Sequence, residues 1–406
     1  MIQEEWRYWA STGSITPGGP SKWHVVDWDQ RRIITVTMDE EQDSADLAIE
    51  HLKKHIDTLG PDVYDIHLSP DGTLISTSTD PRDDHTMCVY YPPLQHTPRP
   101  DRVNTVLRSE LRELDRIGQN VDLVSYTPPS EATKQVNKVV FKYYFIWQFM
   151  KTRWSEMNLW MWLPPHPNIV PFDRIVLDEM NGHIVGFTSV YIPGGTIDEN
   201  GSRVFKLKWL KQLMHVVDDL NLRYGVMHQD IAARNLVVDS NTDSVMLFDF
   251  NFSARIGVSG GPCDSGYSQD RNDVKGVIFT AYEIITRDQH FRDVPPDQQD
   301  TADLDRLEEW VQHPDVKLDH HVSEYRSVLN EWAERRREGK QIAIYTEAPE
   351  YIDWPTLPSP PKKRVRHTDG TSTVWEIWME NRRDKGKGNA LNWERPPQNR
   401  LGSVQT

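Results

Sequence analysis

One short stretch limits the fold and the chemistry of this chain more than any other. Residues 227–257 read MHQDIAARNLVVDSNTDSVMLFDFNFSARIG. The apolar runs LVVD and VMLFD flank the turn-forming SNTD, which predicts a β-hairpin. Because a hairpin returns the chain to its starting point, we expect Asn235, before the first strand, and Asp249, after the second, at the same end. Asp230 lies in the loop immediately before them.

Three oxygen-bearing side chains at one end of a hairpin indicate a site for a hard cation. Asp230, Asn235 and Asp249 offer carboxylate and amide oxygens, and the stretch contains no cysteine. Such ligands suit Mg²⁺ together with a phosphorylated ligand. One carboxylate then remains to orient an incoming hydroxyl group. The structural alternative is that these side chains only cap turns and hairpin ends.

Length and charge exclude several classes of protein. The 406 residues suffice for two or three folding units, and a formal charge of −15 argues against binding to nucleic acid or to anionic membranes. Cys88 and Cys263 are too few for a disulfide framework, so a reducing compartment is expected. Neither a leader segment nor a long apolar run is evident. We therefore expect a cytoplasmic protein.

The chain is expected to have three parts. Residues 1–102 mix strand-like runs such as WHVVDW and RIITVTM with the helix-like AIEHLKKHIDTL, which predicts a small accessory α+β unit. Residues 103–340 show regular apolar periods, including strands at 121–126 and 139–144. Residues 341–406 are proline-rich and then polar, and this composition predicts a mostly disordered tail.

A helix with a core-facing stripe is predicted over residues 145–163. Its large apolar residues recur at spacings of three and four, which places them on one face. They are Trp147, Met150, Trp154, Met157 and Met161. Such a stripe most often packs in a core rather than against a cofactor.

The tail contains a basic run that resembles a nuclear-import signal. The segment PPKKRVR includes Lys362–Arg366, which would bind an import receptor in an exposed, extended form. Short basic runs also occur by chance. A nuclear location therefore stays an alternative to a purely cytoplasmic one, and the oligomeric state is not predicted.

The motif order resembles that of the protein kinase superfamily. His228, Asp230 and Asn235 match the spacing of its catalytic loop, and Asp249 with Phe250 matches its metal-binding motif. The segments NLWMWLPPHPNIVPF and LFDFNFSARIG are similar in sequence to segments of the divergent protein-kinase-like proteins of filamentous fungi. The resemblance covers roughly residues 103–340.

Further motifs extend the resemblance upstream. VVFK resembles the third strand of kinases, so Lys142 would hold the α- and β-phosphates of ATP, with Glu156 on the following helix as its partner. A partly buried ammonium group needs such a carboxylate to stay charged. HPNIV resembles the turn after that helix, and SVYIPGGTI resembles the hinge. Ser189 would then be the gatekeeper, with Tyr191 and Ile192 beside the adenine.

Downstream, DVKGVIFTAYEIIT resembles a buried kinase helix in which Asp273 would brace the catalytic loop. The resemblance implies an α+β, bilobal fold: a small antiparallel β lobe with one helix at about 103–191, and a mainly helical lobe at about 192–340. Nucleotide would bind between the lobes. The N-terminal α+β unit would be an extension of this fold.

The resemblance implies an ATP- and Mg²⁺-dependent phosphotransferase acting on a hydroxyl of a protein substrate. Asp230 would orient the hydroxyl, while Asn235 and Asp249 would hold Mg²⁺. Arg234 would either neutralise phosphate or hold the loop. His228 would be structural, packing against Phe250 and bonding the loop backbone.

Four departures from the family pattern bear on activity. Gly118 is the one glycine retained of the three expected in the phosphate loop, which weakens nucleotide binding. Asn251 replaces a glycine after Asp249 and tolerates a positive φ. Gln229 replaces an arginine that pairs with a phosphorylated loop, so constitutive or partner-set activity is expected. Residues 257–272 lack the Ala-Pro-Glu element.

Two other functions remain open from the sequence. The degenerate phosphate loop favours a pseudokinase scaffold that binds nucleotide or partners without efficient transfer. The short segment 257–272 favours a small-molecule phosphotransferase of the aminoglycoside or choline type, which shares the catalytic-loop spacing.

Overall fold

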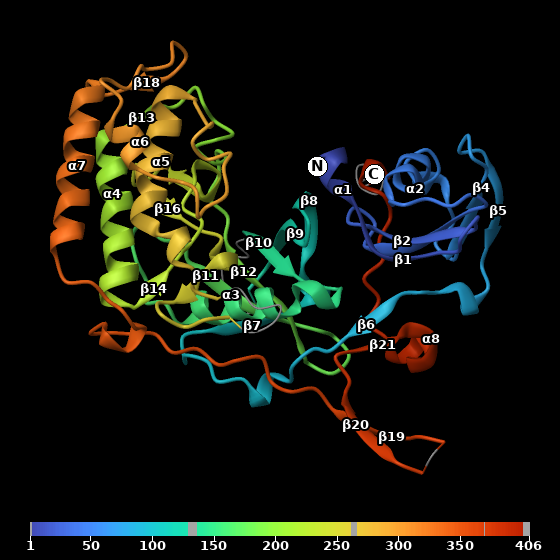
Figure 1. The fold of residues 1–406 in the computed structure, drawn as a ribbon. Helices are drawn as coiled ribbons and strands as arrows, with labels where there is room; N and C mark the ends of the chain where they lie inside the picture. Colours follow the sequence, from blue (N-terminus) through green and yellow to red (C-terminus); the bar gives the residue numbers. More distant parts are fainter. Residues whose placement is uncertain (1, 129–135, 261–265, 369, 401–406) are drawn as a thin grey trace.

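The computed structural model describes residues 2–128, 136–260, 266–368 and 370–400. Over these residues the chain has an α+β fold with mixed sheets, which confirms the expected class. Figure 1 shows a helical part, a six-stranded sheet beside it and a smaller unit at the N-terminus. Cys263 lies outside the described residues. Among those described, no helix combines the length and apolar character needed to cross a bilayer.

The N-terminal unit is a five-stranded sheet covered by one helix. RIITVTM forms a strand as predicted, and AIEHLKKHIDTL contributes most of a helix followed by a 3₁₀ turn. Ala48 and Leu52 of the helix pack on Val25, Ile34 and Val36 of the sheet. The elements are α1 (Glu4–Arg7), β1 (Tyr8–Ile15), β2 (Ser21–Asp27), β3 (Arg32–Met38), α2 (Asp46–Leu52), β4 (Asp65–Leu68) and β5 (Leu74–Ser78).

A six-stranded sheet forms the centre of the molecule, in the order β7-β11-β12-β10-β9-β8. The strands predicted at 121–126 and 139–144 are present as β9 and β10. The sheet is mixed rather than purely antiparallel, because β7 adds parallel to β11. Its strands are β7 (Asn104–Leu107), β8 (Arg112–Gly118), β9 (Val121–Tyr126), β10 (Asn137–Tyr143), β11 (Phe172–Leu177) and β12 (Ile184–Val190).

The predicted helix over 145–163 is present as α3 (Met150–Trp162), preceded by a 3₁₀ turn. Four residues of the predicted stripe are buried as expected: Met150, Trp154, Met157 and Met161. Trp147 is 39% exposed, so the prediction was wrong for this residue. It lies in the 3₁₀ turn, where the α-helical spacing that aligns side chains on one face does not hold.

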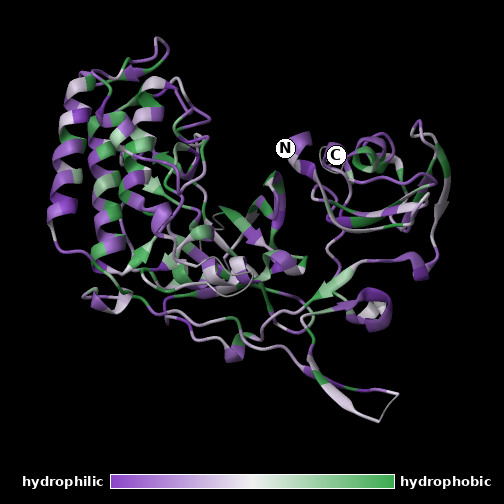
Figure 2. Ribbon diagram, viewed as in Figure 1, coloured by the Kyte–Doolittle hydropathy of each residue, from purple (hydrophilic) through white to green (hydrophobic). Residues whose placement is uncertain are grey.

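The helical part packs four helices and several short strand pairs into the main core. Figure 2 shows that the outermost helix, α7, is largely hydrophilic, with hydrophobic residues between the helices. The helices are α4 (Leu207–Asp218), α5 (Asp273–Thr286), α6 (Ala302–Asp305) and α7 (Val322–Glu338). The strands are β13 (Val204–Phe205), β14 (Val226–Met227), β15 (Leu236–Asp239), β16 (Ser244–Leu247), β17 (Ala254–Arg255) and β18 (Lys317–Leu318).

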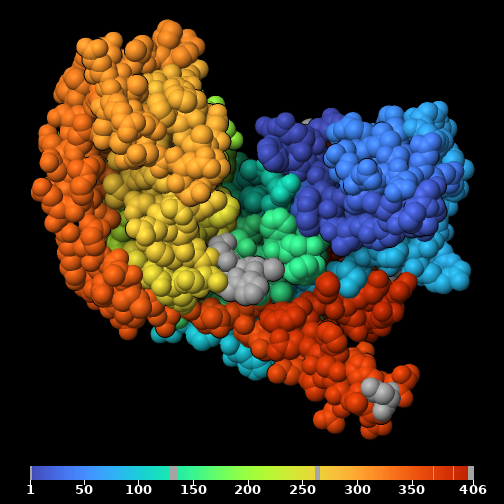
Figure 3. Space-filling view, in the orientation of Figure 1, coloured from blue at the N-terminus to red at the C-terminus, as the bar shows by residue number. Residues whose placement is uncertain are grey.

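The C-terminal segment differs from the mostly disordered tail that composition predicts. Residues 341–368 and 370–400 run along the molecule from the helical part to the N-terminal unit (Figure 3). Trp354 and Trp393 are buried. The overall composition hid these contacts, because a single tryptophan buries a large apolar area. The elements are β19 (Lys362–Arg366), β20 (Ser372–Glu376), β21 (Met379–Asn381), which pairs with β6 (Met87–Val89), and α8 (Arg382–Lys385).

The N-terminal unit, the central sheet and the tail share a second core. The Trp28 ring contacts the Phe145 ring edge-on at 5.3 Å, and Trp393 stacks on Tyr143 at 5.0 Å. Arg395 pairs with Asp122 at 2.9 Å beside these rings. One face of the central sheet is therefore covered by segments from both ends of the chain.

Candidate functional site

The predicted hairpin at 227–257 is present as β15 and β16. Leu236 pairs with Leu247, and the backbone N–H of Phe248 donates to the carbonyl of Asn235 at 3.1 Å. The residues that enter and leave the hairpin are thus adjacent. This local turn chemistry sets the positions of Asn235 and Asp249.

A buried lysine joins three elements. Lys142 Nζ lies 2.5 Å from Glu156 Oε1 on α3 and 2.5 Å from Asp249 Oδ1 after the hairpin. Its strand neighbours Phe141 and Tyr143 belong to the core shared with the N-terminal unit, so strand alternation places Lys142 on the opposite face. Three residues far apart in the sequence therefore form one charged group.

Glu156 is fully buried between two cations. Its Oε2 accepts from Arg153, one helical turn earlier, and its Oε1 accepts from Lys142. Glu156 thus contacts Lys142, its predicted partner, and also Arg153 of its own helix. A buried carboxylate is tolerated only with such pairing.

Asp249 is held in a conformation that residues other than glycine rarely adopt. Its φ is 67° and its ψ is 69°, and its side chain is 23% exposed. Burial raises the pKa of this carboxyl, but the charge and hydrogen bond of Lys142, together with the charge of Arg153, outweigh burial and leave the pKa below its usual value. Asp249 is thus ionised and partly open. Asn251, expected to have the positive φ, instead lies in a 3₁₀ turn.

The loop after β14 links Asp230, Arg234 and Asn235 directly. Arg234 Nη2 donates to Asp230 Oδ1 at 2.5 Å, and Asn235 Nδ2 donates to Asp230 Oδ2 at 2.8 Å. Asn235 is 3% exposed, and within the described residues its Oδ1 makes no hydrogen bond. The amide oxygen is the atom left for a cation.

Asp273 braces this loop as predicted. Its Oδ2 accepts from the backbone N–H of His228 at 2.7 Å and its Oδ1 from that of Gln229 at 2.7 Å. Burial raises its pKa above the usual value even though these bonds act in the opposite direction. His228 Nε2 lies 3.1 Å from the Phe248 carbonyl and its ring 5.0 Å from that of Phe250, which confirms its structural role.

Gly118 ends β8 at a tight turn rather than within a longer glycine-rich loop. It pairs with Val121 across a two-residue turn, and Gln119 of that turn donates to the Trp6 carbonyl at 2.9 Å. Val121 in turn pairs with Lys142, so Gly118 is two strands, roughly 10 Å, from the lysine strand. A role of Gly118 in nucleotide binding stays a prediction, with few backbone N–H groups in so short a turn.

The predicted hinge residues follow the last strand toward the helical part. Ser189 is buried on β12 and pairs with Val140, two positions from Lys142. The Tyr191 N–H donates to the Lys138 carbonyl at 3.4 Å. Ile192 is partly buried against the main core. These residues therefore lie along the connection between the central sheet and the helical part.

Two residues of this site were missed by sequence reasoning. The Trp160 ring lies 5.2 Å from Phe250 and 5.8 Å from Lys142 Nζ, and it was read only as part of a helix. The sequence identified Gln229 only as the residue that replaces an arginine. In the structure its side-chain amide forms hydrogen bonds with two segments that are distant in the sequence. Its partners are backbone groups, which leave no mark in the sequence.

A cavity of about 670 Å³ lies beside the Asp230 loop. Ala232, Ala233 and Arg234 form part of its wall, with Trp209 and Glu283 from α4 and α5. Its volume falls in the range of small-molecule sites. Asp230 does not line the cavity itself and is reached only through its hydrogen bond with Arg234.

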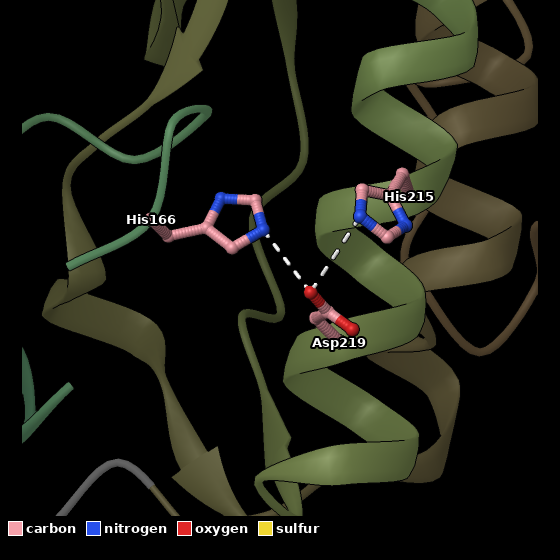
Figure 4. Close-up of side chains that lie close together, drawn as sticks. All are labelled: His166, His215 and Asp219. Atoms are coloured by element: carbon pink, nitrogen blue, oxygen red, sulfur yellow. Dashed lines mark hydrogen bonds and ion pairs between the residues drawn. The ribbon is translucent and has the colours of Figure 1, made fainter. Parts of the chain in front are cut away.

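His166, His215 and Asp219 form a separate cluster (Figure 4). His166 Nδ1 accepts from the Asn168 N–H at 3.0 Å, so neutral His166 carries its proton on Nε2 and donates it to Asp219 at 3.1 Å. Ligation through Nε2 would place a proton on Nδ1, against the Asn168 N–H. The cluster therefore fits a structural link between HPNIV and α4 better than a metal site.

Neither the family models nor the curated proteins compared with this chain gave a match. The site is therefore interpreted from its geometry together with the resemblance of its motifs.

Proposed function

We propose that this chain is an ATP- and Mg²⁺-dependent phosphotransferase with a bilobal, protein-kinase-like fold. The observation that carries the proposal is the contact of Lys142 with both Glu156 and Asp249. The antiparallel order β8-β9-β10-β12-β11, with α3 between β10 and β11, supports the small lobe that the resemblance implies. The helices from α4 to α7 correspond to the larger lobe.

The donor set fits Mg²⁺ and a nucleotide. Asp249 is ionised and 23% exposed, and Asn235 has an unused amide oxygen, both hard ligands. Bound Mg²⁺–ATP supplies the phosphoryl group and a cation that neutralises its charge. The two-residue turn after Gly118 gives few backbone donors, so we expect weak nucleotide affinity.

Glu156, Asp230 and Arg234 would hold the charged groups of the site in position. Glu156 pairs with the Lys142 ammonium and fixes its direction, so the ammonium would be placed for contact with phosphate oxygens. Asp230 accepts the hydrogen bond of an acceptor hydroxyl, and Arg234 fixes the orientation of that carboxylate through its 2.5 Å contact. Catalysis would come mainly from positioning and charge neutralisation.

Transfer from labelled ATP tests the proposal. The purified chain with Mg²⁺ should label itself or a member of a protein panel, and Asp230→Asn should lower the rate by about 10²- to 10⁴-fold. Asp305→Asn, at an exposed position of α6, is the matched control. Equal rates for wild type and Asp230→Asn would refute the proposal. Thermal stabilisation by ATP and Mg²⁺ without any transfer would instead favour the pseudokinase scaffold.

The cavity beside Arg234 favours a second candidate, a small-molecule phosphotransferase. Its volume would accommodate a compact hydroxylated acceptor beside Arg234, the residue that bonds Asp230. Turnover of soluble hydroxylated metabolites, with no transfer to proteins, would establish this alternative over the first.

We also propose an import receptor as a partner of Lys362–Arg366. All five side chains are exposed, on a hairpin that projects from the molecule (Figure 3). The backbone is paired with Ser372–Glu376, so binding as an extended strand requires the hairpin to open. Nuclear accumulation in cells that is lost on replacing these basic residues by alanine would support this partner, and unchanged distribution would contradict it.

A further inference from the structure

Gln229 occupies a strained and buried position beside the proposed acceptor-orienting residue. It is 5% exposed and has a φ of 66°, a left-handed conformation unusual for a residue with a side chain. Its backbone N–H is held by Asp273 at 2.7 Å. The main chain of Gln229 is therefore held by a contact that does not involve its side chain.

The Gln229 amide joins the Asp230 loop to two other segments. Its Nε2 donates to the Phe252 carbonyl at 2.6 Å and to the Gly266 carbonyl at 3.1 Å. Its Oε1 accepts from the Ser268 N–H at 2.5 Å. The side-chain NH₂ group and the side-chain carbonyl of Gln229 both form hydrogen bonds. Every partner is a neutral backbone group. Phe252 follows Asp249 closely, so the bridge reaches the predicted metal ligand as well.

We propose that Gln229 is a positioning residue that sets the relative placement of the Asp230 loop, the Asp249 turn and residues 266–268 without a phosphate group. The proposal rests on the proposed phosphotransferase function. A charged side chain at this position would need a counter-ion to be stable when buried. A neutral amide bonded to backbone groups needs none. The arrangement is therefore assembled in the unmodified chain.

Two variants separate the role of the bridge from simple stability. Gln229→Leu removes all three hydrogen bonds, and Gln229→Glu keeps the acceptor for Ser268 while losing both donors at neutral pH. The matched control is Gln298→Leu, at an exposed position. Hydrogen exchange of the full-length chain is followed at residues 252–260 and 266–268, together with transfer from labelled ATP.

We expect Gln229→Leu to speed exchange in both segments by at least about 10-fold, and to lower kcat by about 10- to 100-fold with little change in the KM for ATP. Gln229→Glu should recover activity as the pH falls, because a protonated carboxyl donates again. Wild type treated with phosphatase, and free of phosphate by mass spectrometry, should keep its rate within about 2-fold.

Unchanged exchange in both variants, or a 10-fold loss of rate after phosphatase treatment, would overturn the proposal. If wild type transfers no phosphate at all, the proposed function fails, and exchange alone then decides whether Gln229 bridges the segments. The two failures are therefore distinguishable.

Discussion

Glu156 is the carboxylate that pairs with both buried cations of the site. It is completely buried, and it neutralises Lys142 and Arg153, which are themselves buried. Removing one partner of such a pair leaves uncompensated charge in a medium of low polarity. The ionised state of Asp249 depends on the same lysine, so both carboxylates respond to changes in this group.

Replacing Glu156 by glutamine should therefore destabilise the fold. We expect a loss of about 3 kcal/mol in the free energy of unfolding, since Lys142 retains Asp249 but Arg153 loses its acid. Urea denaturation measures the change. The control, Glu334→Gln on the exposed side of α7, should stay within about 0.5 kcal/mol. A similar small change for Glu156→Gln would show that the pairing contributes little.

The lowered pKa of His24 leads us to predict that the stability of the fold depends on pH. Burial, followed by the neighbouring charge of His85, lowers its pKa from 6.5 to about 4. Protonation therefore favours the unfolded chain, and the stability contribution is present above pH 6.5 and lost as the pH falls toward 4. His24→Gln should flatten the dependence of the melting temperature on pH in this window. Parallel curves for the two proteins would contradict this assignment.

At the scale of elements, the tail holds α3 in place. Trp154 Nε1 donates to the Pro355 carbonyl at 3.1 Å, and Trp354 Nε1 donates to Ser155 Oγ at 3.2 Å. Arg255, on β17, lies 4.0 Å from the Trp354 ring. The segment around Trp354 therefore links the helix that carries Glu156 to the strand that follows the Asp249 turn.

Trp354→Ala should loosen this link. We expect a loss of about 3 kcal/mol in unfolding free energy, as for other buried tryptophans, and faster hydrogen exchange along α3. Trp375→Ala is the matched control, because this tryptophan is in the same tail and 58% exposed. Equal effects of the two substitutions would mean that burial of Trp354 does not stabilise α3.

Local patterns in the sequence predicted the helices and strands that carry the site. They did not predict the contacts between segments that are distant in the sequence. The β15–β16 hairpin follows from SNTD between apolar runs, and α5 covers the whole of DVKGVIFTAYEIIT. The burial of Trp393 depends on contacts of the tail with the N-terminal unit and the central sheet. No local pattern encodes such contacts, so a mostly disordered tail was expected instead.

At the scale of the whole molecule, both ends of the chain are built into the central sheet. Trp28 from the N-terminal unit and Trp393 from the tail lie in one core with Phe145. Arg395 bonds Asp122 and Glu113 of the sheet. The accessory unit is therefore packed on the sheet through apolar and charged contacts rather than attached only by a linker.

This shared core predicts cooperative unfolding. Calorimetry of the full chain should give one main transition, and Trp393→Ala should separate the N-terminal unit into an earlier one, because its apolar contact with the sheet is weakened. Trp375→Ala again serves as the control. Two transitions already present in the wild type would show that the parts unfold independently.

The central claim is that Lys142, Asn235 and Asp249 form one site for nucleotide and metal. Calorimetric titration of ATP with and without Mg²⁺ into wild type and Asp249→Asn tests it most directly. We predict binding by the wild type that is strengthened by Mg²⁺, and loss of that Mg²⁺ dependence in the variant. Identical binding curves for the two proteins, or no binding by either, would contradict the claim.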